Sequence, residues 1–350
     1  MTQVSGHVRV PARLIALLCV SALVLASCGT SAVVVKAHLD GTPAISISVP
    51  LSEISCTLND VCVAAGTATD GAGPTSVAEF SSPKGNWFNL AIPATSPTLL
   101  TSVACSGAEC LLGGSSPGHD LLLMFDSHGS TVTNVTPPTG GIGVTALTCN
   151  ATTCALIDTS ATGEPRFSVS ANEGATWANP LPLAWAKGDA ITAFACGSAL
   201  ECVVGVLSAS QVFSLYATSN GGATWTQSTT PSTWTTLTSL SCVADQCVGL
   251  ASTSSSSLLV RSKTFTRTWK SVKLAQSASA LACSAFTRCV VVGQRSSEKP
   301  WLATVHDDSA TAIDLRYVPS PLLGVACGSK VCAAIGVTTL VSVPAAPART

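Results

Sequence analysis

Short apolar runs recur along this chain, and each run ends at a cysteine. Within the runs the larger apolar residues take alternate positions, as they do in β-strands that bury one face. The seven runs are Leu51–Ser55, Leu100–Ala104, Val144–Thr148, Ile191–Ala195, Leu237–Ser241, Ser279–Ala282 and Leu322–Ala326. The cysteines that follow them are spaced by 49, 44, 47, 46, 41 and 44 residues, and a repeat of that length is typical of a propeller or solenoid.

Each unit holds enough apolar segments for four strands. Another apolar run, such as Val203–Val206, follows a second cysteine and predicts a tight hairpin between the first two strands. Third strands are predicted at Ser76–Phe80, Leu121–Phe125, Arg166–Val169, Val212–Tyr216, Leu258–Arg261 and Trp301–Val305. A turn then leads to a fourth strand. The predicted fold class is therefore all-β, a seven-bladed β-propeller with four-stranded blades.

The seventh unit is one strand short. Its predicted strands are Leu323–Cys327, Val331–Val337 and Thr339–Val343, and a Pro/Ala tail follows. The alternating segment Ala44–Val49 is predicted to pair with the last of these strands and close the ring, because an unpaired edge strand invites aggregation. The predicted domains are a signal peptide over 1–27, a tether over 28–43, the propeller over 44–345 and a tail over 346–350.

Fourteen of the 16 cysteines form seven close pairs, each enclosing four or five residues. They predict one hairpin disulfide per blade: Cys56 with Cys62, Cys105 with Cys110, Cys149 with Cys154, Cys196 with Cys202, Cys242 with Cys247, Cys283 with Cys289, and Cys327 with Cys332. Zinc ligation is the alternative, but zinc needs ligands that converge, whereas these pairs lie one per blade. Disulfides persist in oxidising compartments, so we expect an exported protein.

The first residues of the chain resemble a bacterial lipoprotein leader. Arg9 and Arg13 precede Leu14–Ala26, an apolar run of 13 residues that is too short to span a bilayer as a helix. The run ends in Leu-Ala-Ser-Cys-Gly, which resembles a lipobox with Cys28 as the acylated residue. Ordinary cleavage near Ala26 is the alternative. The resemblance implies lipid anchoring at the extracytoplasmic face of a cell membrane.

The turn between the third and fourth strands carries a second motif. Ser170–Trp177 (SANEGATW) and Thr218–Trp225 (TSNGGATW) resemble the Asp-box, S-x-D-x-G-x-T-W, of BNR-like propellers. In this turn Asn or Asp bonds the backbone, glycine permits a positive φ, and tryptophan packs on the sheet. Sialidases, sortilin-type receptors and photosystem II assembly-factor-like propellers share the motif. The resemblance implies an architecture and no particular activity.

Two hydrolase hypotheses are weighed against this architecture. Gly114–Gly118 fits G-x-S-x-G, but that motif needs a strand-to-helix elbow, and here it predicts a hairpin turn before His119 and Asp120. The resemblance to sialidases implies an arginine triad, a Tyr–Glu pair and an acid/base carboxyl near the axis. The innermost strands contain no arginine, and Glu53 is their only charged residue. We therefore predict no catalytic residue, and keep a sialidase-like or other glycan-processing hydrolase as the alternative function.

Charge is uneven along the chain. The formal net charge is -1, which gives no global attraction to nucleic acid. Eight basic residues nevertheless fall between positions 261 and 299, against one acidic residue, Glu298: Arg261, Lys263, Arg267, Lys270, Lys273, Arg288, Arg295 and Lys299. A solvated patch is one interpretation, and a site for an anionic lipid headgroup or acidic glycan is the other.

The function predicted from these patterns is binding. Variable loops on a rigid scaffold are where ligands usually dock, and the connections from second to third and from fourth to first strands vary most here. The predicted contact residues are Trp185, Trp234, Lys270, Arg295 and Lys299. We expect a monomeric, non-catalytic binding or scaffold protein without cofactor or metal, whose partners are the membrane and an unidentified protein or glycan.

Overall fold

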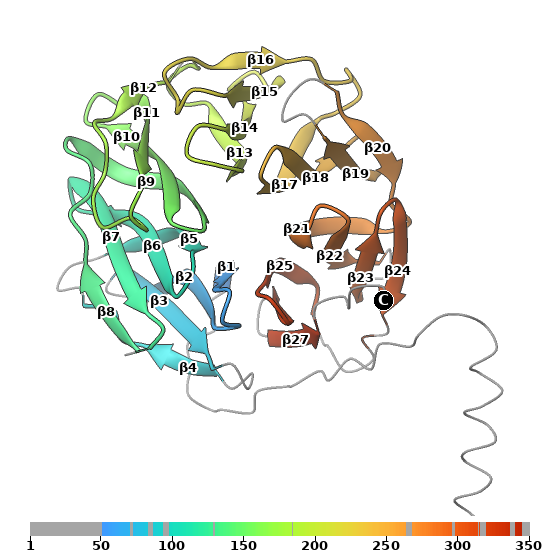
Figure 1. Ribbon diagram of the computed structural model, residues 1–350, viewed down its shortest axis with the longest axis horizontal. Coiled ribbons are helices and arrows are strands. Elements are labelled where there is room, and N and C mark those ends of the chain that lie inside the picture. Colours follow the sequence, from blue (N-terminus) through green and yellow to red (C-terminus); the bar gives the residue numbers. More distant parts are fainter. Residues whose placement is uncertain are drawn as a thin grey trace, which may run out of the picture. The chain divides into compact units, whose positions relative to one another are not determined.

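Seven antiparallel sheets surround a central axis in the computed structural model (Figure 1). The structure describes residues 51–70, 73–82, 87–93, 98–128, 130–183, 185–263, 268–295, 298–313, 315, 320–336 and 340–344. All of them belong to one compact unit, Val35–Thr350. Six sheets have four strands and the last has three, and strands adjacent in the chain are adjacent in each sheet. The seven-bladed prediction is thus confirmed.

The first four blades follow the chain in order, each from its inner strand A to its outer strand D. Blade 1 contains β1 (Leu51–Cys56), β2 (Cys62–Asp70), β3 (Gly73–Ser81) and β4 (Trp87–Leu90). Blade 2 contains β5 (Leu99–Cys105), β6 (Glu109–Ser116), β7 (His119–Asp126) and β8 (Thr131–Asn134). Blade 3 contains β9 (Gly141–Asn150), β10 (Thr153–Ser160), β11 (Pro165–Ser170) and β12 (Leu181–Pro182). Blade 4 contains β13 (Ala190–Cys196), β14 (Cys202–Leu207), β15 (Phe213–Thr218) and β16 (Thr226–Ser228).

The last three blades continue the same pattern. Blade 5 contains β17 (Thr236–Val243), β18 (Gln246–Ser252), β19 (Ser257–Ser262) and β20 (Lys270–Lys273). Blade 6 contains β21 (Ser277–Ala285), β22 (Arg288–Gln294), β23 (Pro300–His306) and β24 (Ser309–Ile313). Blade 7 contains β25 (Leu322–Cys327), β26 (Val331–Gly336) and β27 (Leu340–Pro344). The predicted closing strand Ala44–Val49 lies outside the described residues, as do Cys28, the tether and the tail.

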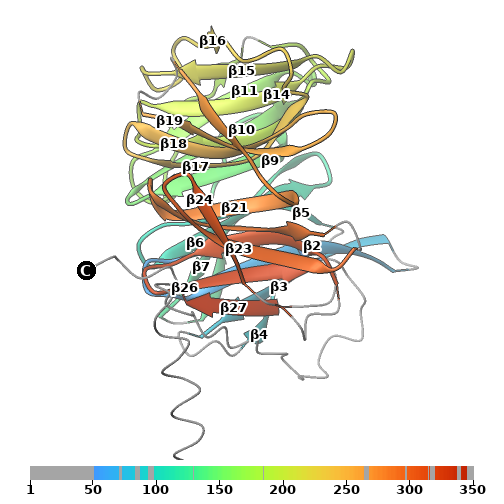
Figure 2. The same ribbon diagram turned by 90° about the vertical axis from the view of Figure 1, so that its right-hand side faces the viewer.

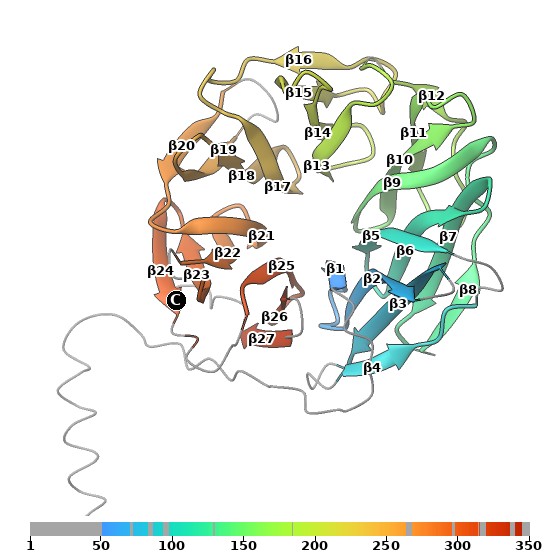
Figure 3. The same cartoon turned by 180° about the vertical axis from the view of Figure 1, so that it is seen from behind.

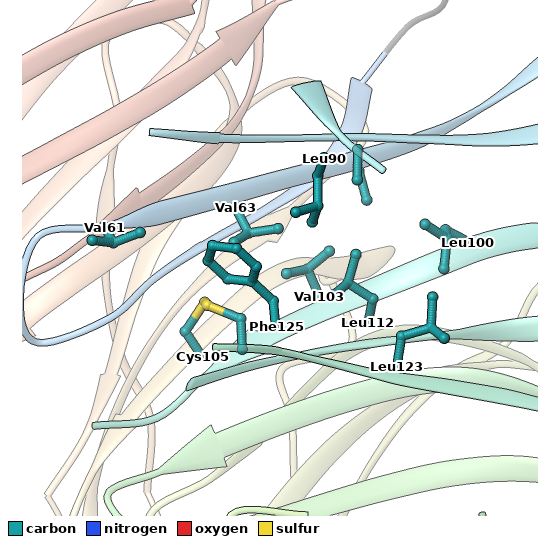
Figure 4. Close-up of a cluster of buried hydrophobic side chains, with 12 residues drawn as sticks. Val61, Val63, Leu90, Leu100, Val103, Cys105, Leu112, Leu123 and Phe125 are labelled. Atoms are coloured by element: carbon teal, nitrogen blue, oxygen red, sulfur yellow. A yellow bond between two sulfur atoms is a disulfide. The ribbon is translucent and has the colours of Figure 1, made fainter. Parts of the chain in front are cut away.

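The hydrophobic core is divided into seven clusters, one at each seam between neighbouring blades. At the first seam Val63 of β2 and Leu112 of β6 pack against Phe125 of β7 (Figure 4). At the last seam Trp87 and Ala64 of blade 1 pack against Ile335 of blade 7. This division follows from the strand pattern, because β2, β6 and the other B strands have both faces covered by neighbouring blades. The side view in Figure 2 shows the sheets stacked in this way.

A polar contact also joins blade 7 to blade 1. The Asp60 carboxylate, in the turn between β1 and β2, accepts hydrogen bonds from the backbone amides of Lys330 and Val331, at 2.8 and 3.1 Å. The Ser329 hydroxyl donates a third at 3.1 Å. Asp60 itself has φ 64°, which an Asp tolerates better than most residues. The two ends of the described ring are therefore joined by contacts between described residues.

All seven predicted disulfides are present, and each links the end of an A strand to the start of the following B strand. The bonded pairs are Cys56 with Cys62, Cys105 with Cys110, Cys149 with Cys154, Cys196 with Cys202, Cys242 with Cys247, Cys283 with Cys289, and Cys327 with Cys332. Their Cα–Cα distances are 3.9 to 4.1 Å. Such short distances arise because the two cysteines are directly opposed across the ladder, as Cys196 and Cys202 are.

No helix long and apolar enough to cross a membrane occurs among the described residues.

Candidate functional site

The A strands lie nearest the axis of the ring, as Figure 3 shows from behind. They line a central cavity of about 330 Å³. All seven of them contribute to its wall, which consists mainly of Ser, Thr and Ala with flanking aliphatic residues. Glu53 of β1 is the one charged side chain among the described residues that line it. Burial raises the pKa of the Glu53 carboxyl to about 7, because a charged form is poorly solvated there. One carboxyl alone does not make the acid–base pair that glycoside cleavage generally needs.

A pair of carboxyl groups does exist, but at the seam between blades 2 and 3. Asp158 of β10 is completely buried, and Arg166 of β11 binds it in a bidentate manner, with N–O distances of 2.8 and 2.7 Å. Asp120, at the start of β7, is 3% exposed and faces Asp158. Neither carboxyl lines the central cavity.

The folded structure favours the protonated form of Asp120. Burial and then the charge of Asp158 raise the pKa of Asp120 to about 7, while Arg166 lowers it. The oxygens of Asp120 make no hydrogen bond of good geometry with described residues, although the pKa of Asp120 also reflects the proximity of the Asp158 carboxyl and the Gly143 amide. The protonated form of Asp120 has an O–H group that can donate a hydrogen bond to a neighbouring carboxylate. The sequence feature that could have indicated this site is Asp158, a charged residue within the apolar strand Thr153–Ser160.

A crevice lies between blades 5 and 6, over the basic segment of the chain. Its two adjoining parts have volumes of about 650 and 420 Å³. Lys273, Leu274 and Arg295 line both parts. Hydroxyl groups of the loop before β19, among them Thr253 and Ser256, line the larger part, as does Glu298. The serine-rich run from 252 to 257 could have indicated this wall from the sequence. It was not among the residues predicted to contact a ligand.

The five predicted contact residues lie in different environments. Arg295 is exposed and lines the crevice, Lys299 is exposed on the same loop, and Lys270 is exposed at the start of β20. Trp185 and Trp234 are each 5% exposed, so the prediction that they lie on a binding surface is wrong. The ring of Trp185 packs 5.3 Å from that of Tyr216, and the ring of Trp234 lies 6.2 Å from that of Trp269. The loops that carry Trp185 and Trp234 fold toward the seams between blades, because burying a large apolar ring there is favourable.

Arg261 also leaves the predicted basic surface. It is 8% exposed, and its guanidinium donates hydrogen bonds to the backbone carbonyls of Phe286 and Asp307 in blade 6. Its carbon Cζ lies 5.3 Å from the centre of the Phe286 ring. The side chain therefore joins two blades. Arg267 lies outside the described residues.

The turns at Ser170–Trp177 and Thr218–Trp225 have a structural role. In both, the Asn side chain accepts a hydrogen bond at 2.9 Å from the backbone amide four residues on, that of Thr176 or Thr224. Gly222 has φ 85°, and a Cβ there would lie 2.3 Å from the Phe167 ring. The turn thus packs tightly on the preceding blade.

Metal binding and serine hydrolysis find no support in the geometry of the described residues. No group of three or more His, Cys, Asp and Glu side chains among them is placed to hold an ion. Ser115 and Ser116 end β6, and Gly118 has φ 81° in a two-residue hairpin turn before His119. Gly114–Gly118 therefore leads into the predicted hairpin turn and does not form the strand-to-helix elbow that the hydrolase motif needs.

Comparison with known proteins identifies the fold alone. No protein-family model matches the sequence, and no curated protein matches it. A solved structure described as YCF48 bound to D1 peptide has a TM-score of 0.61 at 14% identity, covering 89% of this chain and 97% of that one. Virginiamycin B lyase from Staphylococcus aureus gives 0.62 at 9% identity, covering 90% and 99%.

A third structure, hydrazine synthase from Kuenenia stuttgartiensis, gives a TM-score of 0.62 at 9% identity and covers 88% of this chain and 99% of its own. One of these three structures is described with a bound peptide and two are named as enzymes. Likeness at such identities is a likeness of architecture, on which many functions are built. This chain is therefore a β-propeller structurally similar to those proteins.

Proposed function

We propose that this chain is a non-catalytic binding protein, anchored through a lipid on Cys28 to the outer face of a bacterial membrane. The observation that carries the proposal is the chemistry of the central cavity. Its wall presents hydroxyls and aliphatic groups around one carboxyl, Glu53. Catalysis requires acids, bases or dipoles preorganised around a reacting atom, and the described part of this wall offers no such set.

We place the ligand in the crevice between blades 5 and 6. Lys273 and Arg295 supply positive charge there, and Glu298 and Asp308 supply negative charge. The hydroxyls of Thr253 and Ser256 supply hydrogen bonds, and Ala275 supplies apolar surface. The combined volume suits a segment of a larger partner better than an ion. The partner we expect is a protein or glycan that bears anionic groups. The solved propeller described with a bound peptide supports the idea that this fold can serve such a purpose.

The alternative, a glycan-processing hydrolase, has one observation in its favour, the Asp120–Asp158 pair. Glycosidases keep their two carboxyls roughly 5–9.5 Å apart with the substrate between them. Here the two buried groups lie close together beside Arg166, and neither lines the central cavity. That arrangement supports a structural role.

The experiment is a binding screen against glycan arrays and extracts of surface proteins at low and high salt. Arg295→Glu and Lys273→Glu are expected to weaken capture several-fold, and salt is expected to weaken it too, because exposed charges are screened over about 8–10 Å at physiological ionic strength. Lys187→Glu is the matched control, since Lys187 is exposed in the loop between β12 of blade 3 and β13 of blade 4 and lines neither part of the crevice. Equal capture by all three variants would remove the crevice from the proposal. Glycoside hydrolysis that is lost in Glu53→Gln or Asp120→Asn would establish the enzyme instead.

A further inference from the structure

Every A strand has a bulge at the same place. In β9 and β21 the pairing of A with B also skips a second residue, Ile142 and Ser284. One skip, however, occurs at the same place in all seven blades, and the residue skipped there has no partner opposite it. The seven residues skipped there all line the central cavity: Ser52, Thr101, Thr145, Thr192, Thr238, Ser279 and Leu323. Six of the seven carry a hydroxyl, which makes a ring of hydroxyl groups around the axis.

Three members of this ring commit their hydroxyl hydrogens to the backbone. Thr101 donates to the Val144 carbonyl at 2.6 Å, and Thr145 donates to the Ile157 carbonyl at 3.0 Å. Thr238 donates to the Leu250 carbonyl at 3.4 Å. A hydroxyl whose hydrogen is used in this way can still accept hydrogen bonds through its lone pairs. These three oxygens, in residues that line the cavity, therefore keep the capacity to accept hydrogen bonds.

A carboxyl group also lines the cavity. The Thr192 oxygen, which has no hydrogen-bond partner among the described residues, is buried beside Gly205 and is not exposed to the cavity. Glu53 follows Ser52 on β1 and lines the same cavity. No hydrogen bond or ion pair joins its carboxyl to another described residue. A carboxyl group is expensive to leave unsatisfied in a confined space.

We propose that the central cavity binds a primary ammonium group, held by the Glu53 carboxylate and the surrounding hydroxyl oxygens. An ammonium group has three donors and no acceptor, which complements a wall of acceptors. Its charge also compensates that of the carboxylate. A volume of about 330 Å³ accommodates an amine with a chain of several carbon atoms. This site is separate from the crevice and does not rest on the function proposed for it.

The ammonium group has two sources, a free alkylamine or a lysine side chain of a partner protein. Two probes separate them: 1-aminobutane and a short peptide with an acetylated N-terminus and a single lysine. Isothermal titration calorimetry at pH 8 measures each against the wild type. Glu164→Gln is the control, because Glu164 is an exposed carboxylate in blade 3 that does not line the cavity.

Glu53→Gln is expected to weaken binding of the probe at least about tenfold, or about 1.4 kcal/mol, and Glu164→Gln is expected to leave it unchanged. The neutral amide should fold well, because burial already disfavours the charged carboxyl. Ser279→Ala, which removes one hydroxyl of the ring, is expected to weaken binding less.

Binding is also expected to fall between pH 8 and pH 5.5, because protons then compete for Glu53. Among described residues, the strands packed around Glu53 bring only neutral side chains to the cavity, from Thr101 and Ser102 of β5 to Leu323 and Val325 of β25. The proposal is overturned if neither probe binds, if Glu53→Gln binds as tightly as wild type, or if affinity does not change with pH.

Discussion

The buried pair of Asp120 and Asp158 leads to a prediction about pH and stability. In the unfolded chain the pKa of Asp120 is 3.8, and in the folded protein burial and Asp158 raise it to about 7. The folded state therefore binds one more proton than the unfolded state between these values. The contribution of Asp120 to the unfolding free energy is therefore greatest below about pH 4. It falls as the pH rises from about 4 to 7 and is constant above that.

The magnitude follows from the size of the shift. About three pKa units at 1.36 kcal/mol each give an upper value of about 4 kcal/mol. Part of this loss is offset because the negative charge is spread over Asp120 and Asp158 and lies near Arg166. We therefore expect the unfolding free energy to fall by about 2–4 kcal/mol. Asp120→Asn keeps the shape and the neutral state of the protonated acid. This variant should exceed wild type in unfolding free energy by that amount at pH 8 and match it near pH 4.

Urea denaturation with the disulfides intact measures both proteins from pH 4 to pH 8. Taking the difference between variant and wild type removes the contribution of other titrating groups, such as Glu53. Asp245→Asn is the control, because Asp245 is an exposed residue in the β17–β18 turn and should give a difference near zero throughout. Asp158→Asn should instead destabilise by about 3–5 kcal/mol, because it removes the fully buried carboxylate that binds Arg166 through two hydrogen bonds. A difference between Asp120→Asn and wild type that is constant with pH would refute the reasoning.

Three further predictions concern the scaffold and its anchor. Mass mapping without reduction should recover all seven hairpin disulfides, and a linkage between blades would contradict the repeat. Replacing Cys196 and Cys202 together by Ala should lower the unfolding free energy by about 1–3 kcal/mol, since the closed loop is short. Deleting residues 44–49 should lower the melting temperature or cause aggregation, because the open edge of β27 then lacks a partner, whereas an unchanged melting temperature would show that Asp60 and the Trp87 cluster suffice to close the ring. A fatty-acid analogue should label wild type and not Cys28→Ala, and equal labelling would remove the lipid anchor.

The sequence alone predicted the repeat, the order of strands and every disulfide. These features are local. The cysteines of each pair, such as Cys105 with Cys110 or Cys283 with Cys289, are five or six positions apart, so the hairpin that joins them depends on the chain between them and little else. Alternation of apolar residues also depends only on the strand to which they belong.

The tertiary structure alone decided which polar and aromatic residues are accessible. Trp185, Trp234 and Arg261 lie in or beside segments that predicted exposed loops, yet each is buried against a neighbouring blade. Asp120 and Asp158 are 38 positions apart and meet only because two blades share a seam. The crevice and the hydroxyl ring likewise need several blades in place. Burial of a side chain at a seam depends on what the next blade brings to it, and no short stretch of sequence contains that information.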